Sequence, residues 1–112
     1  ATALWIRSRM PSITTTSSFV DTIVQALRFE GASVPDAGVV KGLHRLGNSP
    51  DMSLAAVCRR EKAEIGDLES LLQTALWLGG AVVSLARAAG FEDAAILGEP
   101  VLAAWQTRVV EP

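Results

Sequence analysis

Two residues in this chain have side chains suited to nucleophilic or acid–base chemistry. Cys58 is the only cysteine and His44 is the only histidine. A catalytic cysteine needs a base within hydrogen-bonding reach to form the thiolate. Nothing in the sequence places His44 against Cys58, which lies in the ordinary helical segment AAVCRR. We therefore interpret Cys58 as a small structural residue and His44 as a partly exposed helix residue, and we predict that the chain is not an enzyme.

Metal, cofactor and phosphate sites require ligand patterns that this sequence lacks. There is no CxxC pair, and no glutamate stands three residues before His44, as it would in a di-iron bundle. The acid pairs Glu61/Glu64 and Glu92/Asp93 lie among charged or turn residues, where solvation or helix capping explains them. The nine glycines form no phosphate-binding loop. We expect no metal and no cofactor.

Length and composition indicate one small domain with an excess of apolar side chains. The chain has 112 residues, of which 49% are hydrophobic, and a domain of this size has much surface to cover. Some apolar surface is therefore expected in an oligomer interface. Twelve acids against ten bases argue against nucleic acid as a partner. One cysteine and no apolar stretch of signal-peptide length near residue 1 favour the cytoplasm.

Apolar spacing predicts a series of helices separated by glycine, proline and serine. The first covers about 17–30, with Ser17 or Ser18 as its cap and Gly31 at its end. Further helices are predicted over about 35–46, and from Ser49-Pro50-Asp51 to about 64. Two short helices, over about 91–97 and 100–110, are expected on either side of Gly98-Glu99-Pro100.

The segment 70–86 has no charged residue and belongs to a predicted helix over about 68–89. Such a helix is either a core helix or a membrane span. A span needs about 20 apolar residues, and several polar residues and glycines dilute this one, so we predict a core helix and no membrane partner. Leu71, Leu78, Val82 and Leu85 should be buried, and Gly79-Gly80 can bend or break the helix.

These elements predict an all-α fold, an irregular orthogonal bundle of five to six helices around the helix at about 68–89. Residues 17–112 would form a single helical domain, preceded by an arm or linker over 1–16. Residues 3–8 are compatible with a short strand, paired with 107–110, or with a tail that docks on the body or on a second subunit.

The function predicted from these features is a non-enzymatic protein-interaction or regulatory module, acting as a homodimer or as a subunit of a complex. Its candidate interaction surface comprises Trp5, Arg7, Arg9, Arg59, Arg60 and Lys62. One alternative is a DNA-binding transcriptional regulator, using a helix-turn-helix over 53–72 or the basic arm 5–9. Against it, Asp67 and Glu69 occupy the candidate reading helix, where phosphates would repel them. A second alternative is a helical bundle that binds a small ligand.

Overall fold

The computed structural model describes residues 2–33 and 37–110, and these residues form helices without a strand. The all-α prediction is therefore confirmed. The elements are α1 (Thr2–Arg9), the 3-10 turn η1 (Met10–Ser12), α2 (Thr16–Phe29), α3 (Ala37–Asn48), α4 (Leu54–Glu61), α5 (Ile65–Ala88) and α6 (Glu92–Val110). The predicted start of the third helix, at Pro35, lies outside the described residues.

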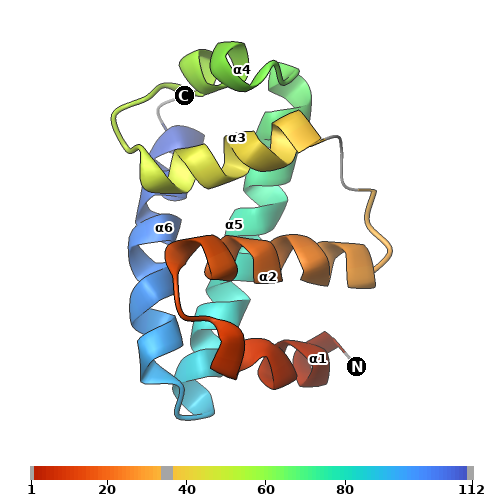
Figure 1. Cartoon of the computed structure of the whole chain (residues 1–112), viewed down its shortest axis with the longest axis vertical. Helices are drawn as coiled ribbons and strands as arrows, with labels where there is room; N and C mark the ends of the chain where they lie inside the picture. The colour runs from red at the N-terminus through yellow and green to blue at the C-terminus, as the bar shows by residue number, and fades with distance from the viewer. Residues whose placement is uncertain (1, 34–36, 111–112) are drawn as a thin grey trace.

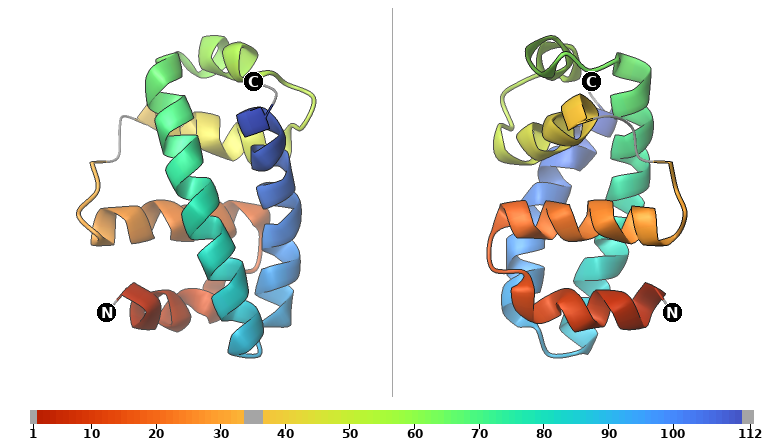
Figure 2. Two further views of the ribbon diagram at one scale, coloured as in Figure 1. Left: turned by 180° about the vertical axis from the view of Figure 1, so that it is seen from behind. Right: turned by 45° about the vertical axis from the view of Figure 1, so that its right-hand side comes forward.

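The helices form an orthogonal bundle, as predicted. α5 and α6 make a long antiparallel hairpin, and α1, α2 and α3 run across it one above another, with α4 at the end beyond α3 (Figure 1). α5 contacts every other α-helix. Seen from behind, α5 lies in front of the crossing helices, and no other helix covers its outer side (Figure 2).

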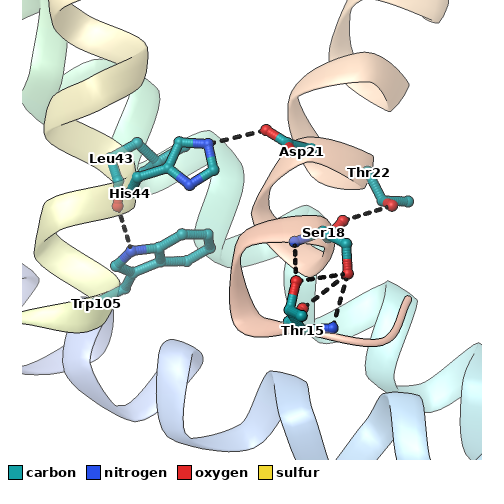
Figure 3. Close-up of polar contacts among 7 residues, drawn as sticks. All are labelled: Thr15, Ser18, Asp21, Thr22, Leu43, His44 and Trp105. Atoms are coloured by element: carbon teal, nitrogen blue, oxygen red, sulfur yellow. Dashed lines mark hydrogen bonds and ion pairs between the residues drawn. The ribbon is translucent and has the colours of Figure 1, made fainter. Parts of the chain in front are cut away.

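α2 begins with a reciprocal capping arrangement. The Thr15 hydroxyl oxygen accepts a hydrogen bond from the Ser18 backbone N–H, and the Ser18 hydroxyl oxygen accepts one from the Thr15 N–H (Figure 3). The cap is thus Thr15, not Ser17 or Ser18 as predicted, and Ser18 is its reciprocal partner. Such a pair satisfies two of the N–H groups that a helix start leaves free.

α5 is one continuous helix of 24 residues, so Gly79-Gly80 does not break it. Leu71, Leu78 and Val82 are buried as predicted, whereas Leu85 is only partly buried. Gly79 lies against the α6 side chain Leu102, which would have to shift to make room for a Cβ there. By length and composition α5 is also apolar enough to cross a membrane, a test that core helices commonly pass.

α6 is also continuous, which corrects the prediction of two short helices around Gly98-Glu99-Pro100. Proline removes the hydrogen bond to the carbonyl four residues earlier, here that of Ile96. Ile96 and Pro100 are both exposed, so water can satisfy that carbonyl. Gly98 is buried, and a Cβ built on it would lie only 2.7 Å from Phe19 Cζ and 2.9 Å from Val83 Cγ2. Gly98 therefore allows α2, α5 and α6 to meet.

Residues 2–12 form a helix and a 3-10 turn that dock on the body, as one of the alternatives predicted, and do not form a strand. Ile6, Met10 and Ile13 are spaced for one helical face, and all three are buried in the common core. Residues 107–110, the other half of the possible strand pair, belong to α6. Ile6, Met10 and Ile13 thus attach the N-terminal segment to the helical body.

The predicted helix start at Ser49-Pro50-Asp51 is wrong, because α4 begins at Leu54 and is capped by the Ser53 side chain. The preceding turn is held instead by Arg108, which is 3% exposed. Its Nε donates a hydrogen bond to the Met52 carbonyl at 2.9 Å. The other two guanidinium nitrogens donate to the carbonyls of Ser49 and Ala104. Burial lowers the pKa of Arg108. The negative charge of nearby Asp51 acts in the opposite direction but has the smaller effect.

The two interior glycines Gly98 and Gly80 provide a matched test of the packing. Gly80→Ala should stabilise the fold by about 0.5–1 kcal/mol, because a Cβ there meets nothing within 4 Å and alanine favours helix. Gly98→Ala should destabilise it by about 1–3 kcal/mol through overpacking against Phe19. Urea unfolding at one low protein concentration measures both, and equal effects would contradict the described packing.

Replacing Arg108 should loosen the turn before α4. Arg108→Ala removes three hydrogen bonds from a buried guanidinium to backbone carbonyls, so the free energy of unfolding should fall by about 2–4 kcal/mol. Arg60→Ala, at an exposed arginine, is the control and should change it by less than about 0.5 kcal/mol. Similar values for the two variants would show that Arg108 does not hold this turn.

Candidate protein-binding groove

Side chains of α1 and α2 fix the N-terminal helix on the bundle. The rings of Trp5 and Phe29 stack with centroids 5.6 Å apart, and the Arg9 guanidinium lies 5.5 Å from the Trp5 ring centroid. Arg9 also donates to the Gln25 side chain at 3.2 Å, and Thr2 donates to Glu30. Trp5 and Arg9, predicted as interaction residues, therefore have partners within their own chain. Arg7 is exposed on the same helix.

This placement of α1 creates an apolar groove between α1, the end of α2 and the middle of α5. Its volume is about 590 Å³. The walls are almost entirely apolar, and they comprise Thr2, Ala3, Ile6, Leu27, Glu30, Ala32, Thr74, Trp77, Leu78, Ala81 and Leu85. Glu30 is the one charged side chain among these lining residues. The groove therefore suits an apolar surface better than a charged or strongly polar ligand.

Trp77 stands at this groove with its side chain largely in solvent. It is 75% exposed, the highest value among the large exposed hydrophobic residues of the described chain. An isolated exposed leucine is ordinary, but a tryptophan beside an apolar groove is typical of a protein-binding surface. The sequence predicts a core helix over this segment and does not distinguish Trp77 from its apolar neighbours. Its exposure depends on which side of α5 the crossing helices leave open, and no sequence pattern reveals that.

Two other cavities have different linings. One of about 660 Å³ lies between η1 and the start of α6 and includes the carboxylates Glu92 and Asp93. Another of about 390 Å³, beside α3, is polar. There His44 Nε2 lies 2.9 Å from Asp21 Oδ1 (Figure 3), and Arg45 lies 3.4 Å from Glu61. Three charged or titratable lining residues, His44, Arg45 and Glu61, thus have partners within the chain.

The predicted interaction residues fall into two separate groups. Trp5, Arg7 and Arg9 lie on α1, whereas Arg59, Arg60 and Lys62 lie at and just after the end of α4. α1 and α4 stand at opposite ends of the molecule (Figure 1). Arg59, Arg60 and Lys62 are all exposed. The fold therefore does not unite the six residues in one surface.

α4 and α5 do have the connection that a helix-turn-helix requires. Three residues separate them, and Lys62 has a left-handed conformation with φ of 55°, which gives the sharp turn without glycine. Leu68 and Leu71 are buried behind the turn. The exposed start of α5, however, presents Asp67 and Glu69, so this unit does not offer phosphates a favourable surface.

Cys58 has the surroundings of a structural cysteine and not those of a reactive one. Cys58 is 7% exposed, and burial, with a smaller contribution from Glu64, raises the pKa of its thiol. A reactive cysteine has the opposite shift. Among the described residues, no group of three or more His, Cys, Asp or Glu side chains is arranged to hold a metal ion.

Comparisons with protein-family models, with curated proteins and with solved structures found no match to this chain.

The raised pKa of the Cys58 thiol predicts that the free energy of unfolding depends on pH. Because the pKa of Cys58 is raised above the ordinary value of about 8.5, the folded state holds the thiol proton more tightly than the unfolded state. The resulting stability is complete below that ordinary value and is lost as the pH rises through the folded pKa. Iodoacetamide should thus modify Cys58 slowly near neutral pH and much faster in urea. Equally fast modification with and without urea would contradict the burial.

Proposed function

We propose that this chain is a non-enzymatic protein-interaction module that binds a partner through the groove between α1, α2 and α5. The observation that carries the proposal is Trp77, which is 75% exposed beside an apolar groove of about 590 Å³. Tryptophan is enriched among the residues that dominate binding energy at protein interfaces. A partner surface that covers Trp77 and fills the groove would remove both from water.

The other functions suggested by the sequence have less support from the arrangement. A small-ligand site needs a few convergent polar groups to orient its ligand, and the groove offers mainly apolar walls. A DNA-binding role would place the acidic start of α5 against phosphates. The two basic groups, on α1 and after α4, stand too far apart to support one DNA footprint together (Figure 1).

Photo-crosslinking in the native cell tests this function. A benzoylphenylalanine at position 74, in the groove, should give a covalent adduct heavier than the 11.8 kDa chain. The same group at the exposed position 41 of α3 is the control and should not. Trp77→Ala, which removes an exposed ring and should leave the fold intact, should abolish the adduct from position 74. An adduct from position 74 that survives Trp77→Ala, or no adduct at all, would contradict the proposal.

A further inference from the structure

The uncovered side of α5 contains a straight seam. Ser70, Gln73, Trp77, Gly80, Ser84 and Arg87 follow one another at alternating steps of three and four residues, and all are exposed or partly exposed. Residues at these steps lie along one side of a helix, as the contact positions of a two-stranded coiled coil do, but here all except Trp77 are small or polar. Arg87 is the one charged member of the seam and lies at its end, so a helix packed along residues 70–84 would remove no ion from water.

The geometry points to a second copy of this chain as the occupant of the seam, with the two α5 helices antiparallel. This inference rests on the proposed function, since the seam borders the groove and shares Trp77 with it. The two-fold axis would pass between Leu78 and Gly79. Trp77 of each copy would then face Gly80 of the other, and each contact would occur twice by symmetry.

The shapes on the two sides of this axis are complementary. Trp77 projects into solvent, and the space over Gly80 is open, because a Cβ built there meets nothing within 4 Å. Side chains on a helix lean toward its N-terminus, so the Trp77 ring lies over the turn that precedes it. In the antiparallel register that turn faces Gly80, Ala81 and Ser84 of the second copy. Small residues of this kind permit two helices to approach closely.

The charges at the ends of the seam favour the antiparallel direction. It places Glu69 of one copy beside Arg87 of the other at both ends. A parallel pair would instead place Glu69 beside Glu69 and Arg87 beside Arg87. Arg87 also contacts Glu92 and Glu99 of its own chain, and its side chain remains 43% exposed and so within reach of Glu69 of the second copy.

Sedimentation equilibrium tests the self-association. The chain should have twice its 11.8 kDa mass at micromolar concentration. Trp77→Ala and Gly80→Leu should each raise the dissociation constant about thirtyfold or more, by removing the ring or by filling its space. Ile96→Ala is the control, since Ile96 is 59% exposed on α6, and it should change the constant less than about twofold. Circular dichroism should be unchanged in all three.

Disulfide trapping tests the direction. In a Cys58→Ala background, two differently tagged chains carrying Gln73→Cys and Ser84→Cys are mixed and oxidised. The antiparallel register places position 73 opposite position 84, so the mixed disulfide should form in preference to either like pair. Preferential pairing of position 73 with itself would overturn the antiparallel arrangement.

A monomer at high micromolar concentration, or a dimer unaffected by both Trp77→Ala and Gly80→Leu, would overturn the inference. The proposed function would survive that result if position 74 still formed a Trp77-dependent adduct with another protein, and it would fail if no such adduct formed. A monomer that binds phospholipid vesicles through Trp77 would assign the seam to a lipid surface, and so would overturn the inference too.

Discussion

Burial of α5 is the constraint on which the rest of the structure depends. The helix is apolar on most sides, and a single neighbour covers only one stripe of such a surface. α6 packs along one side, and α1, α2 and α3 cross another, so that α5 contacts every other α-helix (Figure 2). This arrangement buries Leu68, Leu72, Ala75 and Val82. It also leaves one continuous side without a cover, and there Trp77 lies.

Close contacts at glycines make the crossing possible. Gly98 lets α6 meet Phe19 of α2, Gly79 lets Leu102 of α6 reach α5, and Gly42 of α3 lies beside Leu68. Each of these glycines lies inside a helix, where it costs about 1 kcal/mol relative to alanine. The cost is offset by apolar contacts that a Cβ would prevent. Gly80 makes no such contact, so the packing of one chain does not explain it.

The sequence was sufficient to predict the fold class and the central helix because both follow from hydrophobic periodicity. Errors occurred where local residue types and tertiary packing disagree. Gly98-Glu99-Pro100 is typical of a helix end, yet α6 continues through it because Gly98 is buried against Phe19. Arg108 is buried at 3% exposure, which its charge would not predict, because backbone carbonyls 56 and 59 residues away in the chain accept its hydrogen bonds. The groove was not foreseen, since it depends on where α1 docks.

Solvent access to Trp77 at increasing protein concentration is the most direct measure of whether copies of this chain meet at the open side of α5. In a Trp5→Phe variant, which keeps an aromatic ring against Phe29, the two remaining tryptophans are Trp77 and the fully buried Trp105. Iodide quenching therefore reports on Trp77. We expect strong quenching at low concentration and progressive protection as the concentration rises. Quenching that stays equally strong over the whole range would contradict this account.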